Sequence, residues 1–150
     1  MKNQTESGIS SNFNFTSENI DIQNYDSHLK ISEEKYSKAF HASPNPISIT
    51  TLNDGRYIEI NESYAGQLGY KRNELLGRYS YEVNLFPYPE ERKRMTSKLA
   101  TKGCLRNYPV NYYTKVSGIR KCLVNAEIIE LQGEKYMLAV ITDITDKLRM

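Results

Sequence analysis

Several features that would assign the chain to a common protein class are missing from its 150 residues. No segment is long and apolar enough to span a bilayer, and the polar N-terminus, which begins Met1-Lys2-Asn3, predicts neither a signal peptide nor a membrane anchor. The net charge of +2 gives no strong field, which argues against nucleic acid or an anionic membrane as the main partner. We therefore expect a cytoplasmic protein with no membrane span and no nucleic-acid partner.

Cysteine and histidine are scarce, with two of each. If the strands around Cys104 and Cys122 form a hairpin that turns at residues 116–118, Cys122 lies opposite about Tyr112, and Cys104 lies roughly 26 Å farther along its strand. A disulfide needs Cα atoms within about 7 Å, so two free thiols in a reducing compartment are expected. The two distant cysteines and two distant histidines make no ligand cluster, so no metal site is predicted.

What the chain does contain is typical of a soluble globular domain. Hydrophobic residues make up 39% of the sequence and charged residues 25%, and the length suits one domain with some excess. Residues 1–28 are polar and show no helical period, so they are expected to form a mobile leader. Residues 29–147 are expected to form the domain with its N-terminal helix, and residues 148–150 to begin a truncated helix.

Helix-starting and helix-ending residues divide the first two thirds of the chain. Ser32 and Asn61 suit N-cap positions, and Pro89 suits the first turn of a helix. Gly69 and Gly103 suit positions just after a helix ends. The predicted helices cover residues 32–42, 61–68, 71–76 and 89–102.

Alternating and β-branched segments predict five strands. Asp54-Gly55 is a strong hairpin signal between the first two, because glycine adopts a positive φ at little cost. Pro109 lies in the third strand, where it indicates a bulge or an edge position. The predicted strands cover residues 47–50, 56–60, 105–115, 119–131 and 136–141. The expected fold is α+β, a five-stranded antiparallel sheet with short helices on one face and a flanking N-terminal helix.

This order of elements, and six short motifs within it, resemble the PAS family of sensory domains. In chain order the motifs are Phe40-His41-Ala42-Ser43-Pro44-Asn45-Pro46-Ile47, Asp54-Gly55, Asn61-Glu62-Ser63-Tyr64, Leu68-Gly69-Tyr70, Glu74-Leu75-Leu76-Gly77 and Asp143-Ile144-Thr145. Each is short, but all six occur in the family's order and spacing over about residues 33–147. One departure is Lys71, where the family often has a Ser or Thr cap; the loss of such a cap costs about 1 kcal/mol.

The resemblance implies that a ligand binds between the inner face of the sheet and the helices around residues 61–102, where a concave apolar space suits a small molecule. The alternative is that the same side chains fill the core and leave no cavity, as close packing favours. The ligand-pocket candidates are Met95, Leu99, Asn111, Tyr113, Cys122, Val124 and Ala126.

Two cofactors known from relatives with this fold are argued against. A haem-binding domain that resembles the oxygen sensors would need an axial histidine on the helix of residues 89–102, whereas the histidines are His28 and His41. A photoactive flavin would need a stretch such as Asn-Cys-Arg-Phe-Leu-Gln, and neither Cys104 nor Cys122 has those neighbours. No cofactor is expected, and any ligand would be an unknown small molecule.

The resemblance also implies a signal-relay site and a pairing surface. Asp143 and Thr145 would tie the end of the last strand to nearby backbone and pass strain to a following helix; the alternative is a simple strand terminator. Tyr36, Ala39 and Phe40 fall on one face of the N-terminal helix, the element through which PAS domains commonly pair. A homodimer is therefore expected.

No catalytic arrangement is predicted. The sequence has no phosphate-binding glycine loop, no Ser-His or Cys-His signature and no zinc motif. The basic run of residues 92–94, with Lys98 and Lys102, is interpreted as a solvated helix face with an i,i+4 pair between Glu90 and Arg94, rather than as an anion-binding patch.

Two functions remain open. The first is a sensory input domain that binds a small-molecule signal and relays it, through dimer and C-terminal helix geometry, to an effector such as a histidine kinase or a cyclic-dinucleotide enzyme. The second is a ligand-free PAS module for dimerisation and protein interaction. A cavity of ligand size would distinguish the two.

Overall fold

The computed structural model describes the backbone of residues 15–148 and the side chains of residues 27–148. The chain divides into two units, one up to Ala39 and one from Phe40 onward. The first helix, α1 (Phe15–Ala42), begins well before the predicted Ser32. Side chains 27–39 are all exposed, so this part of the sequence carries no buried stripe that would reveal a longer helix. Residues 15–28, which were expected to belong to a mobile leader, are therefore helical, and residues 1–14 of that leader lie outside the described residues.

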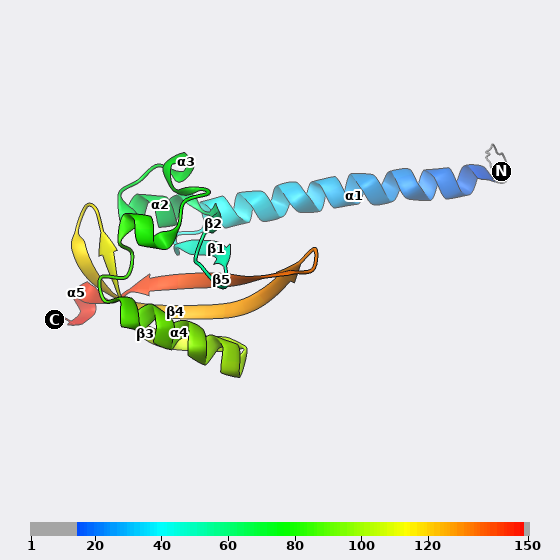
Figure 1. The fold of residues 1–150 in the computed structure, drawn as a ribbon. Helices are drawn as coiled ribbons and strands as arrows, with labels where there is room; N and C mark the ends of the chain where they lie inside the picture. Colours follow the sequence, from blue (N-terminus) through cyan, green and yellow to red (C-terminus); the bar gives the residue numbers. More distant parts are fainter. Residues whose placement is uncertain (1–14, 149–150) are drawn as a thin grey trace. The chain divides into compact units, whose positions relative to one another are not determined.

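The second unit is built on a five-stranded antiparallel sheet (Figure 1). Its strands are β1 (Ile47–Thr51), β2 (Tyr57–Ile60), β3 (Cys104–Thr114), β4 (Gly118–Leu131) and β5 (Glu134–Asp143). Their order across the sheet is β2-β1-β5-β4-β3, so the last strand pairs with the first. The predicted α+β fold is confirmed.

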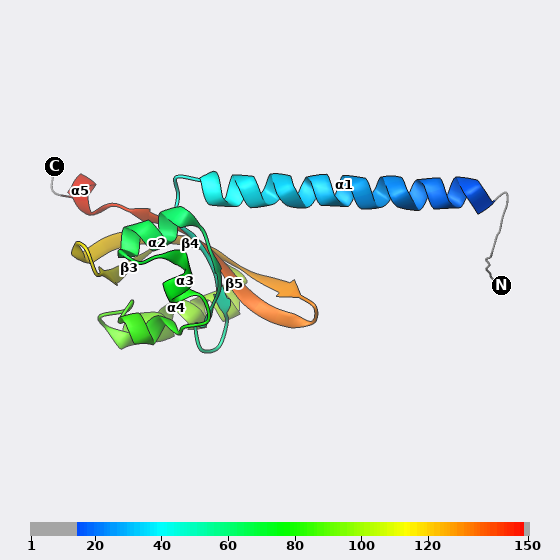
Figure 2. The ribbon, with the colours of Figure 1, turned by 90° about the horizontal axis from the view of Figure 1, so that it is seen from above.

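Short helices cover one face of this sheet, here called the inner face (Figures 1 and 2). They are α2 (Glu62–Leu68), α3 (Arg72–Leu75), the 3₁₀ turn η1 (Ser80–Val83) and α4 (Pro89–Lys102). A final turn of helix, α5 (Thr145–Leu148), follows β5, so the helix predicted from residue 148 begins at residue 145. Residues 149 and 150 of that prediction lie outside the described residues. At the start of α3, the Lys71 N–H donates to the Glu74 carboxylate at 2.8 Å, so the glutamate supplies part of the missing cap.

The core lies between α2–α4 and the inner face of the sheet. Val110, Val124 and Ala139 point inward from the three strands β3, β4 and β5, and each is at most 4% exposed. Met95 and Leu99 of α4 are fully buried, as the predicted helical stripe requires. Complete burial of such side chains contributes roughly 1.5–3 kcal/mol each to folding.

Asn61, between β2 and α2, is a fully buried polar side chain. Its Oδ1 accepts hydrogen bonds from the N–H groups of Ile47 and Tyr64, each at 3.0 Å. Its Nδ2 donates to the carbonyls of Phe40 at 3.0 Å and Asn45 at 2.9 Å. The predicted N-cap is confirmed, and the same amide also fixes the segment that leads into β1.

Gly69 allows the end of α2 to approach the turn between β3 and β4. Its φ is +92°, and an added Cβ would lie 2.6 Å from a methyl carbon of Val116. The Lys115 N–H donates to the Leu68 carbonyl at 2.9 Å, and its ammonium lies 4.9 Å from the ring centre of Tyr70. Any other residue at Gly69 would be strained by the positive φ and would displace the Val116 side chain.

The edge strand β3 is irregular near its start. The register shifts between Leu105 and Tyr108, and Asn107 has a left-handed φ of +49°. Pro109 lies just beyond this bulge on the edge strand, as predicted. Cys122 lies opposite Val110 rather than Tyr112, because the hairpin turns one residue earlier than the sequence suggested. Both cysteines are free thiols.

The substitution Asn61→Asp is expected to lower the free energy of unfolding by on the order of 3 kcal/mol. The carboxylate keeps the two acceptor contacts but replaces the two N–H donors, so it faces the carbonyls of Phe40 and Asn45 in a buried site. Urea unfolding measures the change. The control Asn73→Asp, on an exposed side chain of α3, should stay within about 0.5 kcal/mol of the parent. Equal losses for both variants would contradict the role assigned to Asn61.

Candidate functional site

Five of the seven predicted pocket residues point into the core. Met95 and Leu99 come from α4, and the other three come from β4. Each of the five is at most 2% exposed: Met95, Leu99, Cys122, Val124 and Ala126. The alternation predicted for β4 is therefore correct.

The other two predicted pocket residues are not part of the interior. Tyr113 is 39% exposed, because the residues of β3 that point inward are Val110, Tyr112 and Thr114. Asn111 alternates with them and is half-buried beside α4, where Glu91 accepts hydrogen bonds from its N–H and from its Nδ2, each at 2.8 Å. Tyr112, rather than Tyr113, is the tyrosine of β3 that points into the interior.

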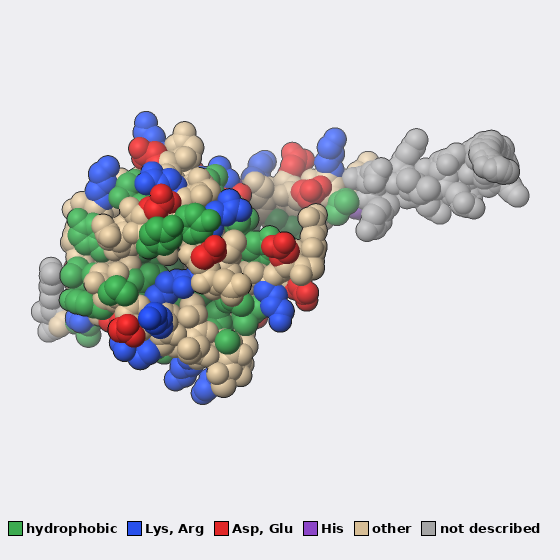
Figure 3. Space-filling view, in the orientation of Figure 1, with side chains coloured by type: hydrophobic (Ala, Val, Ile, Leu, Met, Phe, Trp, Pro, Cys, Tyr) green, Lys and Arg blue, Asp and Glu red, His purple; other side chains and the backbone are tan. Residues whose placement is uncertain are grey.

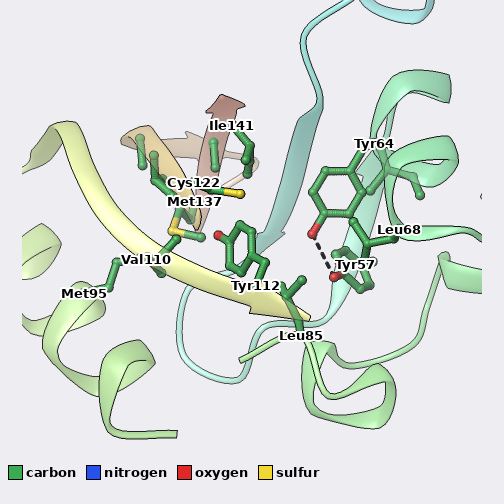
Figure 4. Close-up of a cluster of buried hydrophobic side chains, with 14 of the residues drawn as sticks. Tyr57, Tyr64, Leu68, Leu85, Met95, Val110, Tyr112, Cys122, Met137 and Ile141 are labelled. Carbon is green, nitrogen blue, oxygen red and sulfur yellow. Dashed lines mark hydrogen bonds between the residues drawn. The ribbon is translucent and has the colours of Figure 1, made fainter. Parts of the chain in front are cut away.

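Three tyrosines occupy the centre of the interior (Figure 4). The hydroxyls of Tyr57 on β2 and Tyr64 on α2 are 2.8 Å apart, and their rings meet edge to face. Tyr112 projects toward the strands that carry Cys122 and Met137. Burial raises the pKa of all three hydroxyls above the ordinary value, so they remain neutral hydrogen-bonding groups. The sequence predicted neither Tyr57 nor Tyr64 as interior residues.

A small cavity remains beside these tyrosines. It is lined by Pro46, Tyr64, Gln67, Leu68, Tyr112, Thr114, Cys122 and Ile141. Its volume of about 10 Å³ is close to the minimum that holds one water molecule. Of the predicted pocket residues, Cys122 lines it. Burial raises the pKa of the Cys122 thiol to about 12, so the thiol is neutral at physiological pH.

A polar network surrounds the end of β5. Asp143 Oδ2 accepts from Arg120 Nε at 2.7 Å and from Gln67 Nε2 at 3.2 Å, and its Oδ1 accepts from the Thr145 N–H at 2.9 Å. Thr145 Oγ1 accepts from the Lys121 N–H at 2.8 Å. The two predicted relay residues, Asp143 and Thr145, are thus joined to each other, to β4 and to α2. We call Gln67, Arg120, Asp143 and Thr145 the exit network.

The carboxylate of Asp143 is held in its charged form. Burial alone would raise its pKa, but the hydrogen bonds from Arg120 and Thr145 outweigh burial and lower it below the ordinary value. The Arg120 and Asp143 side chains are each 18% exposed, and Arg120 also lies 3.6 Å from Asp146. Arg120 therefore connects the end of β5 with the first turn of α5.

Basic side chains gather over α4 (Figure 3). Glu90 pairs with Lys93 at 3.8 Å instead of with the predicted Arg94, and both side chains are largely exposed. Lys98 lies 5.7 Å from the ring centre of Tyr108. Such exposed pairs contribute little to stability, which agrees with a solvated helix face.

In the part of the chain that the structure describes, no group of three or more His, Cys, Asp or Glu side chains is arranged to hold a metal ion. Within the same residues, no helix has the length and the apolar character that crossing a membrane requires.

Comparison with known proteins gives a consistent result. The family model described as the PAS fold matches residues 34–144. The sensor protein TdiS of Thauera aromatica is 29% identical over 123 residues, which are 78% of this chain and 22% of that protein. The chain thus spans less than a quarter of this relative.

Solved structures share the fold. The PAS domain of an HTR-like protein from Haloarcula marismortui has a TM-score of 0.66 and 23% identity, and the match covers 81% of this chain and 99% of that one. A PAS domain from a two-component sensor histidine kinase has a TM-score of 0.64 and 11% identity, with 78% and 98% covered.

The lowered pKa of Asp143 predicts a pH-dependent contribution to stability. Above about pH 5 the carboxylate is charged in the folded and the unfolded chain, and its contacts stabilise the folded one. As the pH falls through the ordinary Asp pKa of about 3.9 and then the lower folded value, this contribution is lost. The difference in unfolding free energy between the parent and Asp143→Asn should be largest above about pH 5 and should decrease steadily as the pH falls below that.

Urea unfolding at a series of pH values measures this difference. Glu127→Gln is the matched control, because Glu127 pairs with Arg106 on the exposed side of β4 at 3.3 Å. Because exposed pairs contribute little to stability, the control should change the unfolding free energy little throughout the series. A constant difference for Asp143→Asn down to pH 2 would show that the carboxylate charge does not contribute.

Proposed function

The chain belongs to the PAS family, and from this premise we propose that it is the cytoplasmic signal-input and relay domain of a longer sensor protein. In this proposal residues 29–147 form the sensory unit, the domain itself is not catalytic, and a following effector, such as a histidine kinase, supplies the output. The sensor protein among its relatives, of which the chain matches 22%, supports an effector outside the present sequence.

The exit network is the observation that carries the proposal. A strand terminator needs only a local hydrogen bond, such as the one between the Thr145 N–H and Asp143. Here the Ile144 N–H also donates to the Lys121 carbonyl at 2.8 Å, and Arg120 reaches Asp143 and Asp146. A change in the packing of β4 or α2 therefore changes the direction in which the chain leaves the sheet, which is the geometry that a relay requires.

The packed interior favours the ligand-free module over the sensor that binds a small molecule. Pockets that hold small molecules usually measure about 300–1,000 Å³, far above the roughly 10 Å³ beside Tyr112 and Cys122. The close packing supports the second function, a ligand-free module that couples protein contacts to the exit network. A small-molecule signal would need to open the space between α2 and β4.

Pairing with a second copy completes the proposal. Tyr36 is 76% exposed and Ala39 is also exposed on α1, whereas Phe40 is half-buried with its ring against His41. Tyr36 and Ala39 are therefore the two predicted pairing residues available on the helix surface. An exposed helix with apolar positions gains stability from a partner, because most of the stability of helices in proteins comes from packing of an apolar face.

Native mass spectrometry tests pairing and ligand binding together. We expect a species of twice the chain mass with no added mass, and Tyr36→Glu with Ala39→Glu should shift it to the single chain. Tyr81→Glu, on an exposed tyrosine of η1, is the control and should remain paired. A single-chain species at tens of micromolar contradicts pairing, and an added mass that is lost on denaturation favours the ligand-binding function instead.

The relay is tested in the protein encoded by the complete reading frame. Arg120→Gln and Asp143→Asn each remove the charged contact at the end of β5, so each should change the basal output of the effector several-fold, in the same direction. The matched control Arg106→Gln removes an exposed pair of the same sheet and should leave the output unchanged. Parental output from both folded exit-network variants would contradict the proposed function.

A further inference from the structure

Gln67 is the side chain that the small cavity and the exit network share. It lines the cavity together with Tyr64, Cys122 and other residues. At the same time its Nε2 donates to Asp143 Oδ2 at 3.2 Å, the oxygen that also accepts from Arg120. Gln67 was not predicted from the sequence as a site residue, because a lone glutamine in a short helix carries no recognisable pattern.

The backbone of Gln67 has little freedom to move. Asn61 caps the start of α2, and at its other end the Leu68 carbonyl accepts from the Lys115 N–H at 2.9 Å. The neighbouring residues Tyr64 and Leu68 are buried in the core. When the wall of the cavity moves, Gln67 therefore responds mainly by rotation of its side chain. This side chain has flexible torsions and is only half-buried.

We propose that Gln67 is a positioning residue through which the packing of the cavity wall controls Asp143. A shift of this wall displaces the Gln67 amide from Asp143 and loosens the hold of that carboxylate on Thr145. This inference rests on the proposed function, since it names how that relay is regulated.

The two oxygens of Asp143 explain why one amide matters. Oδ2 receives Gln67 and Arg120, while Oδ1 receives the Thr145 N–H at 2.9 Å. When Gln67 leaves, Arg120 is the remaining side-chain donor to Oδ2, and Arg120 also lies near Asp146. The carboxylate is then free to rotate with Arg120 toward α5, which lengthens the contact between Oδ1 and Thr145.

The charged and titratable groups around Asp143 are few. Arg120 and Cys122 face it from β4, and Asp146 acts through Arg120 from α5. Cys122 stays neutral because burial raises its pKa to about 12, and Gln67 does not titrate. Loss of the Gln67 donor therefore has one expected sign, a rise in the pKa of Asp143, because hydrogen bonds to a carboxylate favour its charged form.

The first experiment removes the amide. In protein labelled with ¹³C at aspartate carboxyls, NMR titration should give a higher pKa for Asp143 in Gln67→Leu than in the parent, and hydrogen exchange at the Thr145 amide should become several-fold faster. Gln67→Lys restores a donor at the same place. It should therefore lower the Asp143 pKa and slow hydrogen exchange at the Thr145 amide, relative to Gln67→Leu. Gly66→Ala, the preceding position of α2, meets no atom within 4 Å and is the matched control.

The second experiment starts from the cavity. Cys122→Val adds bulk to the cavity wall and should raise the pKa of Asp143 and the exchange rate of Thr145, as Gln67→Leu does. In the double variant Cys122→Val should add nothing, because its effect passes through the missing amide. The proposal would be overturned if the pKa of Asp143 were unchanged in Gln67→Leu. It would also be overturned if the effects of the two substitutions on this pKa and on Thr145 exchange were additive in the double variant.

These outcomes are separable from failure of the proposed function. The NMR and exchange measurements concern the isolated chain, whereas the proposed function is judged by the output of the complete protein. If Gln67→Leu loosens Thr145 but leaves that output unchanged, the coupling within the domain is real and the relay function is wrong. If Arg120→Gln changes the output but Gln67→Leu leaves Asp143 unchanged, the relay function holds and the role of Gln67 is wrong.

Discussion

The buried amide of Asn61 is the interaction on which the rest of the domain depends. Its two ends satisfy two N–H groups and two carbonyls, and these belong to the segment before β1, to the first residue of β1 and to the first turn of α2. Asparagine is suited to this position because it offers donors and acceptors without a charge that burial would penalise. With α2 held in this way, Tyr64 and Leu68 enter the core, and Gln67 comes within reach of the end of β5.

The interior that follows from this arrangement is filled by the protein itself. Tyr57, Tyr64 and Tyr112 fill the centre of the space between the helices and the inner face of the sheet. The hydroxyls of Tyr57 and Tyr64 form a hydrogen bond with each other. A densely packed interior transmits displacements because its side chains cannot relax into empty space. The same packing leaves little room for a ligand and brings α2, β4 and β5 into contact around the exit network.

The features that the sequence predicted are those with local causes. Asn61, Asp54-Gly55 and Pro89 act through their own backbone neighbourhoods, and the elements that they begin or join lie within a residue or two of the predicted positions. The fold class followed from their order. The inward residues of β4 were also predictable, because Cys122, Val124 and Ala126 alternate without interruption.

What could not be predicted depends on contacts between distant segments. In β3 the bulge at Asn107 and the earlier turn determine which tyrosine faces inward. The prediction of Tyr113 as a pocket residue was therefore wrong, and Tyr112 was missed. Gln67 and Arg120 join Asp143 only because α2, β4 and β5 meet in space. The length of α1 was missed because side chains 27–39 are all exposed, and the pattern used to detect helices is one of burial.

The irregular start of β3 has a consequence for how copies of this chain can meet. An open sheet edge offers a row of N–H and carbonyl groups to any passing strand, which is the usual route to aggregates. Pro109 lacks one of those N–H groups and the bulge at Asn107 bends the row, while the opposite edge, β2, is only four residues long. Strand addition is therefore disfavoured at both edges of the sheet, although the domain exposes large aromatic side chains such as Tyr81 and Tyr88.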